Sequence, residues 1–297
     1  MRMNFGRSLL TALGVGLAAG IWIERPSIVT SGSAVAGAAA GESDASVSGS
    51  SAYDPTLEAP PAPGLRLVIN LAARRLHVYE NGKRTHTFTV AIGKEGHSTP
   101  RGTFHISRVI WNPWWHPPNR PWARGQKPTP PGPNNPMGRV KMYFLPLYYI
   151  HGTPHTGSLG QAASHGCVRL SNKNAIALAR LVHKYGSPDL SSAQIDRIVA
   201  NSKATRTIWL KRRIPVEIVS RSADVIDGRL EFYAVAAERT AEEVRSDALE
   251  ALAAAGYDAA AVNEAELDAL VNAAADGPVS SSLDALFAAP AAVGLVE

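Results

Sequence analysis

The chain has 297 residues and a formal net charge of +5, and 45% of its residues are hydrophobic. This length provides enough residues for one sizeable core. Cys167 is the only cysteine, which excludes a disulfide within the chain. Its thiol is therefore free, bonded to another molecule, bound to a metal or used as a nucleophile.

The charge is unevenly distributed. Residues 221–297 hold 4 Lys and Arg against 15 Asp and Glu, and the remaining residues hold 26 basic against 10 acidic ones. A basic body suits nucleic acid, anionic lipid or an anionic polymer. An export signal predicted at residues 1–36, and the absence of a nucleic-acid motif, favour a carboxylate-bearing substrate outside the cytoplasm. For any single Lys or Arg, a solvated surface position is an equally good interpretation.

Residues 1–36 are predicted to be an export signal or an N-terminal anchor. Arg2 and Arg7 precede an uncharged apolar run at residues 9–23, which is shorter than a membrane span requires. Residues 34–36 (AVA) fit a cleavage site, which favours removal of the segment over its retention. Residues 37–63 are rich in Ser, Gly, Ala and Pro and are predicted to be a flexible linker.

Residues 64–220 are predicted to form a mainly β domain with helices inserted late. Strand patterns fall at residues 65–70, 75–79, 85–93, 103–109, 141–144, 148–150, 207–210 and 216–220. Asn81-Gly82 predicts a tight hairpin. Residues 172–185 have a helical apolar stripe with Ser171 as its N-cap, and a second capping box begins at Ser191.

Two further segments stand apart. Residues 111–138 are too long for an ordinary loop and contain four tryptophans, which favours a flap that covers substrate. Residues 221–297 are predicted to be an acidic helical extension, with capping boxes at Thr240 and Asn263 and a mobile tail from residue 277. The sequence assigns no function to this extension.

The chemistry centres on SHGCVR at residues 164–169 and on His151, which follows a predicted strand. A thiol needs a base or a positive neighbour to become a nucleophile, and His151 can be that base. No Asp or Glu lies near either motif, so a backbone carbonyl must orient the imidazole. The amides of Gly166 and Cys167 could face a developing oxyanion. Arg169 could bind a substrate carboxylate or pair within the protein.

Two other interpretations compete with a nucleophile. His151, His155, His165 and Cys167 could bind a metal, but Gly152 and Pro154 disfavour the helix that would give the spacing of the first two histidines its meaning. The cysteine could also be a buried structural residue with incidental histidines. The joint occurrence of base, nucleophile and glycine favours catalysis.

At these residues the chain resembles the L,D-transpeptidase catalytic domain family (YkuD-like). The resemblance rests on several motifs in a consistent order between about residues 65 and 219: GK at 93–94, TPRGTF at 99–104, WNP at 111–113, GPNNPMG at 132–138, HG at 151–152 and SHGCVR at 164–169. It implies a β-sandwich-like catalytic domain that acts on peptidoglycan. The small helical C-terminal extension lies outside it.

The resemblance also implies the roles of individual residues. Cys167 would be the nucleophile, His151 the general base oriented by the Gly152 carbonyl, and the amides of His165 to Cys167 the oxyanion hole. The expected site residues comprise a catalytic set and a substrate-binding set: Cys167, His151, Gly152, His165 and Gly166 in the first, and Arg169, Ser164, Tyr149, Trp111 and Trp114 in the second. Neither set requires a metal or another cofactor.

We therefore expect a peptidoglycan L,D-transpeptidase in the periplasm or cell envelope. Its thiolate would attack the third residue of a tetrapeptide stem, release D-alanine and pass the acyl group to an amine. L,D-carboxypeptidase activity, ligation of a wall-linked protein, and a non-catalytic peptidoglycan-binding protein are the alternatives. Stem peptides are the expected partners, nucleic acid is not, and the inner membrane would be a partner only if the N-terminal segment is uncleaved.

Overall fold

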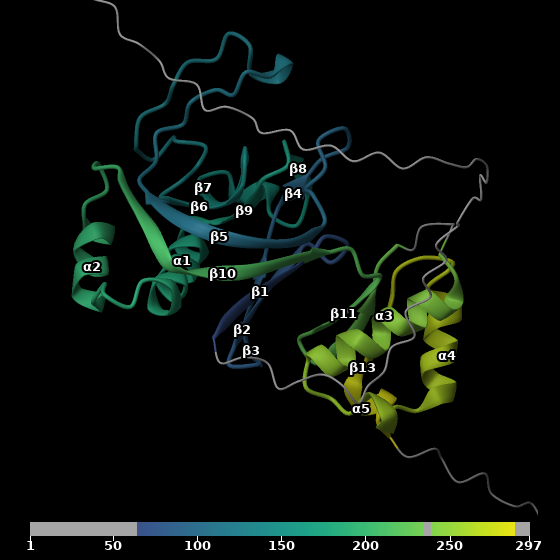
Figure 1. The fold of residues 1–297 in the computed structure, drawn as a ribbon. Helices are drawn as coiled ribbons and strands as arrows, with labels where there is room; N and C mark the ends of the chain where they lie inside the picture. Colours follow the sequence, from purple (N-terminus) through teal and green to yellow (C-terminus); the bar gives the residue numbers. More distant parts are fainter. Residues whose placement is uncertain (1–63, 235–238, 289–297) are drawn as a thin grey trace, which may run out of the picture. The chain divides into compact units, whose positions relative to one another are not determined.

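The computed structural model describes residues 64–234 and 239–288. Its largest element is an eight-stranded mixed sheet with the order β3-β2-β1-β10-β5-β6-β7-β9 (Figure 1). The strands are β1 (Leu65–Asn70), β2 (Arg75–Glu80), β3 (Lys83–Thr89), β5 (Gly102–Trp111), β6 (Val140–Leu145), β7 (Tyr148–Thr153), β9 (Val168–Ser171) and β10 (Arg206–Val219). The pairs β1–β10 and β7–β9 are parallel, and the other neighbours are antiparallel. A mainly β domain with inserted helices is thus confirmed. The predicted export signal and linker lie outside the described residues.

Turn chemistry fixes the edge of this sheet. Asn81 and Gly82 both have positive φ, at 51° and 83°, between β2 and β3. Positive φ at both central residues is what a two-residue hairpin requires, and Asn-Gly tolerates it best. The hairpin predicted from this dipeptide is therefore confirmed.

One face of the sheet packs on helix α1 (Asn172–Gly186), and the short helix α2 (Ser192–Ala200) lies near the start of β10 (Figure 1). Ser171 caps α1 by accepting the amide of Asn174, and Ser191 with Gln194 forms the capping box of α2, as predicted. The apolar side chains that α1 buries share one stripe: Ala175, Leu178, Ala179 and Val182. Burial of a side chain such as Leu178 contributes about 1.5–3 kcal/mol, so the stripe fixes α1 on the sheet.

A second, two-stranded sheet brings distant motifs together. Strand β4 (Ile92–Gly93) pairs in parallel with β8 (Ala162–Ser164). The amide of Lys94 donates to the carbonyl of Ser164 at 3.0 Å. The GK turn therefore lies directly against the segment that leads to Cys167.

The long segment between β5 and β6 is closed at its base by one side chain. The side-chain Nδ2 of buried Asn135 donates to the backbone carbonyls of Pro113, Thr129 and Pro130 at 2.9–3.0 Å. Its side-chain Oδ1 accepts the backbone amide of Met137. Beyond this point Trp115 and Thr129 form an isolated β-bridge, and the 3-10 helix η1 (Pro121–Ala123) lies near the tip. The flap is a closed ribbon, with its ends held together.

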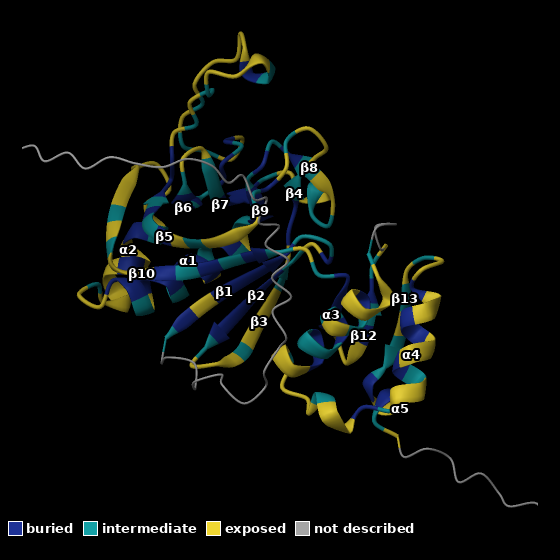
Figure 2. Ribbon diagram, turned by 45° about the vertical axis from the view of Figure 1, so that its right-hand side comes forward, coloured by how far each residue is buried: buried dark blue, intermediate teal, exposed yellow. Residues whose placement is uncertain are grey.

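The C-terminal extension has its own apolar core (Figure 2). Its helices are α3 (Ala241–Ala254), α4 (Glu264–Ala273) and α5 (Leu283–Leu286), with the 3-10 helix η3 (Ala259–Ala261). The capping box predicted before α3 is present at Thr240 and Glu243, whereas before α4 only the N-cap is present, because the Asn263 side chain accepts the amide of Glu266 and the reciprocal bond is missing. The extension also holds a three-stranded sheet of β11 (Ala223–Ile226), β12 (Arg229–Phe232) and β13 (Val279–Ser282), which the sequence analysis did not predict. Strand β13 and α5 fall in the stretch expected to be a mobile tail.

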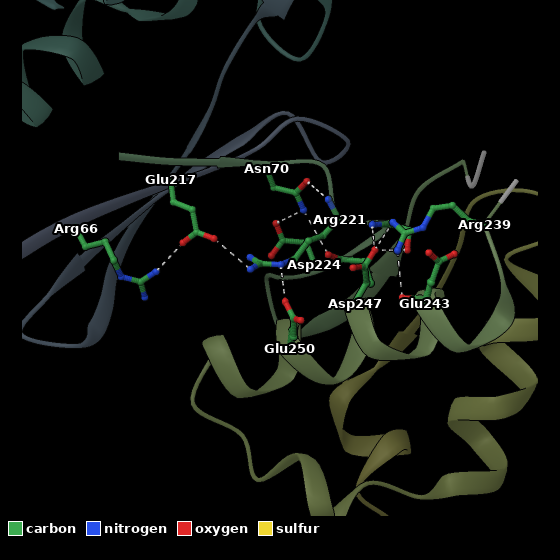
Figure 3. Close-up of polar contacts among 11 residues, drawn as sticks. Arg66, Asn70, Glu217, Arg221, Asp224, Arg239, Glu243, Asp247 and Glu250 are labelled. Atoms are coloured by element: carbon green, nitrogen blue, oxygen red, sulfur yellow. Dashed lines mark hydrogen bonds and ion pairs between the residues drawn. The ribbon is translucent and has the colours of Figure 1, made fainter. Parts of the chain in front are cut away.

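Polar contacts join the acidic extension to the larger sheet (Figure 3). Buried Asp224 accepts from His77 Nε2 at 2.7 Å and from the amide of buried Asn70 at 3.5 Å. Arg221 bridges Glu217 on β10 and Glu250 on α3. Asp224 is thus an acidic side chain of the extension that is paired with residues of the larger sheet.

Candidate active site

His151 lies on β7, and Cys167 immediately precedes the neighbouring strand β9. His151 is on β7, and the parallel register places it opposite Arg169 on β9, two residues beyond Cys167. Paired residues of neighbouring strands share a face of the sheet, so Arg169 lies on the side that His151 faces, and Cys167 precedes Arg169 by two positions. The separation of sixteen residues in sequence becomes one strand spacing in the fold.

His151 is held as a neutral base. It is buried, and its Nδ1 lies 2.7 Å from the carbonyl oxygen of Gly152. Because a carbonyl can only accept, Nδ1 carries the proton and Nε2 is left to accept another. Burial lowers the pKa of His151 to about 4, and the cations Arg169 and Lys141 act in the same direction. The ring is therefore uncharged at neutral pH.

Cys167 is also uncharged in the resting site. Its side chain is partly exposed, and Sγ lies 3.6 Å from the carbonyl oxygen of Leu147. Burial raises the pKa of the thiol, while a hydrogen bond from the Tyr149 backbone and the charges of Arg169 and Lys141 oppose the rise. Thiol and imidazole are thus both uncharged at neutral pH, and the charges of Arg169 and Lys141 act on both groups.

The turn before Cys167 is fixed by two hydroxyl groups. Ser164 Oγ accepts the amide of Gly166 at 3.0 Å and donates to the carbonyl of Cys167 at 2.6 Å. Thr99 Oγ1 donates to the carbonyl of Gly166 and accepts the amide of Gly93, both at 2.9 Å. This corrects two expectations. Ser164 is buried and engaged in the turn, so it does not face substrate, and the Gly166 amide is already bonded and does not face an oxyanion.

Position 166 requires a glycine, both for its backbone conformation and for lack of space. Its φ is +109°, a conformation that side chains rarely adopt, and an added Cβ would lie 2.6 Å from the ring of Tyr148. The amides of His165 and Cys167 remain as the donors that flank this glycine. The turn can pack against the Tyr148 ring because position 166 has no side chain.

His165 is packed between two aromatic rings. Trp122 stacks on it with ring centroids 3.9 Å apart and planes at 8°, and His97 meets it edge-on at 4.7 Å. Burial lowers the pKa of His165, with Lys94 as the second cause. Trp122 belongs to η1, so the flap contacts the residue two positions before the nucleophile.

Of the remaining residues expected to bind substrate, two lie in the site and two lie elsewhere. Tyr149 and Arg169 lie beside Cys167, as the hydrogen bond and the charge effect on the thiol indicate. Trp111 does not line the site: it is fully buried, donates from Nε1 to His183 Nε2 at 3.0 Å and belongs to the core. Trp114 is exposed and stacks on His116 within the flap.

Sequence reasoning missed Lys141. It is on β6, directly opposite His151, and its Nζ lies 4.7 Å from the ring centroid of Tyr149. Burial lowers the pKa of Lys141, while the charge of Cys167 opposes that change. The alternating pattern of β6 would place Lys141 on one face with Tyr143, but which face meets the site depends on strand pairing.

The described part of the chain contains no group of three or more His, Cys, Asp or Glu side chains that could hold a metal ion. His151, His155, His165 and Cys167 are therefore not gathered into such a cluster. Within the same residues, no helix is long and apolar enough to cross a membrane.

Comparisons with known proteins agree with this architecture. The sequence model of the YkuD family, described as the L,D-transpeptidase catalytic domain, matches residues 64–217, more than half of the chain. The protein belongs to the L,D-transpeptidase catalytic domain family.

Proteins with similar sequences are also named L,D-transpeptidases. The chain is 37% identical over 117 residues to the probable L,D-transpeptidase YbiS of Escherichia coli K12, covering 36% of this chain and 38% of YbiS. It is 33% identical over 138 residues to the putative L,D-transpeptidase YkuD of Bacillus licheniformis, covering 45% and 70%. The chain thus spans about two fifths of the length of YbiS. The NMR structure of the catalytic domain of an E. faecium L,D-transpeptidase aligns with a TM-score of 0.35 and 16% identity, over 52% of this chain and 95% of that one.

Proposed function

We propose that the protein is a peptidoglycan L,D-transpeptidase of the cell envelope that works through a thioester on Cys167. The observation that carries the proposal is the hydrogen bond from His151 Nδ1 to the carbonyl of Gly152. It leaves Nε2 as the acceptor on a neutral ring, on the strand next to the thiol. A nucleophile with an adjacent, oriented base is the arrangement that acyl transfer requires.

The first half of the reaction forms the thioester. His151 Nε2 takes the proton of the Cys167 thiol, and the sulfur attacks the carbonyl carbon of the third stem residue. The amides of His165 and Cys167 are the candidates to stabilise the oxyanion. When the tetrahedral adduct collapses, the bond to D-alanine breaks and its nitrogen receives the proton from His151. Arg169 and Lys141 stabilise negative charge on sulfur as the proton leaves.

The second half transfers the acyl group. An amine of another stem attacks the thioester carbonyl, His151 accepts its proton, and the Cys167 sulfur leaves and is reprotonated. One peptide bond is broken and one is formed, so no energy-rich cofactor is consumed. Water in place of the amine would give an L,D-carboxypeptidase, and a protein lysine would give a wall-protein ligase.

Three observations support an envelope location and an anionic substrate. The relatives carry the name L,D-transpeptidase, residues 1–36 have the pattern of an export signal, and two cations, Arg169 and Lys141, act on the thiol. Stem peptides have carboxylates, and such a site attracts them.

Intact-protein mass spectrometry with purified tetrapeptide-stem muropeptides tests the proposal. We expect an acyl adduct on the native protein, release of D-alanine and a cross-linked dimer, and none of the three with Cys167→Ala. Shortened tripeptide stems without dimers would indicate a carboxypeptidase. Native turnover by Cys167→Ala would overturn the thioester mechanism, and a native protein without adduct or product would favour a non-catalytic peptidoglycan-binding protein.

A further inference from the structure

The face of the sheet that carries the site extends well beyond it. On β6, residues 140, 142 and 144 are buried, whereas Lys141, Tyr143 and Leu145 are partly exposed on the other side. Strand register places Trp209 of β10 opposite Arg108 of β5, Arg108 opposite Tyr143, and Tyr143 opposite Tyr149 of β7. These residues form a row across four neighbouring strands. We call Trp209, Arg108, Tyr143 and Tyr149 the cation–aromatic row.

Contacts between side chains make the row continuous. The guanidinium carbon of Arg108 lies 3.9 Å from the ring centroid of Tyr143 and 4.6 Å from that of Trp209. Tyr143 meets Tyr149 edge-on at 5.8 Å. At its other end, the row reaches the site through β7, where Tyr149 and His151 are two residues apart and share a face of the strand. The row is therefore an extension of the active site.

The guanidinium of Arg108 is fixed by aromatic rings and has an edge available to an anion. Rings on two sides fix the guanidinium through cation–π contacts, which leave its N–H edge unused. Among the described residues, no carboxylate pairs with Arg108. This differs from Arg66, which stacks on Tyr79 at 4.3 Å but forms an ion pair with Glu217. A guanidinium that is fixed by stacking and has a free edge suits bidentate binding of a carboxylate.

The charged side chains of the segments from β5 to α1 are positive. Residues 96–188, which supply β5 to β9, the flap and α1, contain no Asp or Glu and 11 Lys and Arg. Lys141 and Arg169 continue the positive field from Arg108 to the thiol, and Arg108 contributes to the lowered pKa of Lys141. A face without carboxylates keeps its cations available for an anionic ligand.

Spacing indicates which part of the ligand reaches Arg108. Strands β5 and β9 are three positions apart in the sheet, which corresponds to about 14 Å at the usual strand separation. An extended peptide covers this distance with about four residues. The carboxylate at Arg108 is thus distant from the carbonyl that Cys167 attacks.

We propose that the cation–aromatic row is a carboxylate-binding subsite, with Arg108 as the anchor for a stem-peptide carboxylate remote from the scissile bond. The inference rests on the proposed function, because it takes its ligand from that function. Tyr143 and Trp209 hold the guanidinium, and Lys141 adds a second positive charge nearer the thiol. Binding energy from this remote group would position the carbonyl at Cys167.

Calorimetric titration of the full chain carrying Cys167→Ala tests the subsite without turnover. The ligands are a tetrapeptide-stem muropeptide and the same muropeptide with its internal carboxylates converted to amides. We expect the acid to bind more tightly than the amide, and added Arg108→Gln to weaken acid binding about tenfold, the loss of roughly one charge-assisted hydrogen-bonded contact. Amide binding should hardly change. Arg108→Lys should be intermediate, because lysine lacks the fork.

Arg66→Gln is the matched control, since it removes a stacked arginine that is already paired with Glu217. It should leave both affinities unchanged. Equal binding of acid and amide by the parent, or equal effects of Arg108→Gln on both ligands, would overturn the subsite and leave the proposed function intact. A loss confined to Trp209→Ala would indicate stacking of a sugar or peptide instead, and would also overturn it. Failure of both muropeptides to bind would count against the proposed function itself.

Discussion

Trp122 lies flat on His165, with ring centroids 3.9 Å apart and planes at 8°. One ring comes from the tip of the flap and the other from the segment that carries the nucleophile, and 43 positions separate them in the sequence. The contact fixes where the flap lies relative to Cys167. The base of the flap is closed by Asn135, and this stack holds the tip against the segment that carries Cys167.

Replacement of Trp122 by alanine should therefore impair substrate use more than stability. An aromatic pair contributes about 0.5–1.5 kcal/mol beyond its buried area, so we expect kcat/KM with muropeptides to fall about three- to tenfold. Trp114→Ala is the control, because Trp114 is in the same flap but stacks on His116. Steady-state kinetics and thermal unfolding of both variants make the comparison. Equal losses in the two would mean that the flap tip does not act through His165.

The pH dependence of activity should reflect the neutral thiol–imidazole pair. His151 has a pKa of about 4 instead of 6.5, and burial raises the pKa of Cys167 above 9. The base is lost only when pH falls through the lower value, so kcat/KM should be nearly flat from about pH 5 to pH 8. A pH–rate profile with muropeptide substrate measures this. A fall centred near pH 6.5 would show that His151 titrates as an exposed histidine.

Acid should destabilise the fold through His183. Its Nε2 accepts the indole N–H of Trp111, and burial lowers its pKa from 6.5 to about 4. The unfolded chain binds the proton at the higher pH, so this stability is complete above pH 6.5 and is lost between pH 6.5 and pH 4. The loss at pH 5 should be about 2 kcal/mol.

Urea unfolding at pH 7 and pH 5 measures this effect. His183→Gln keeps a hydrogen-bond acceptor but does not titrate, so its loss of stability on acidification should be about 2 kcal/mol smaller than that of the native chain. The buried His151 contributes a similar acid sensitivity in both proteins, and the difference between them isolates His183. An identical loss in native and variant would contradict the prediction.

Gly166→Ala should disrupt the turn that presents Cys167. The backbone at φ +109° and the Cβ contact of 2.6 Å with Tyr148 both oppose a side chain. We expect a loss of about 2–4 kcal/mol in unfolding free energy, together with slower alkylation or acylation of the thiol. Gly157→Ala, where an added Cβ meets nothing within 4 Å, should change neither. A stable Gly166→Ala variant with native reactivity would show that the turn adapts.

Local sequence patterns predicted most of the catalytic domain. The Asn-Gly hairpin, the caps at Ser171 and Ser191, and the pairing of His151 with a backbone carbonyl all depend on residues close in the chain. Asp227-Gly228, with φ of 47° and 76°, is an equally good hairpin signal between β11 and β12. That pair would have revealed the C-terminal sheet.

Other features could not be predicted because they depend on strand order. Trp111 and Trp114 lie three positions apart, yet one is in the core and the other exposed, since β5 ends at Trp111. Lys141 reaches the site only because β6 pairs with β7 in a register that sets it opposite His151. The hydroxyl of Ser164 turns inward to bond Gly166 and Cys167, a geometry that its type does not reveal.

The contacts of Asp224 with His77 and Asn70 bear on where the catalytic unit ends. The family match stops at residue 217, seven positions before this aspartate. A protein shortened to the matched region would leave the buried imidazole and amide of β2 and β1 without their carboxylate, and buried polar groups without partners are costly. The family match therefore ends inside a region that folds cooperatively. The catalytic domain should be purified together with its acidic C-terminal extension.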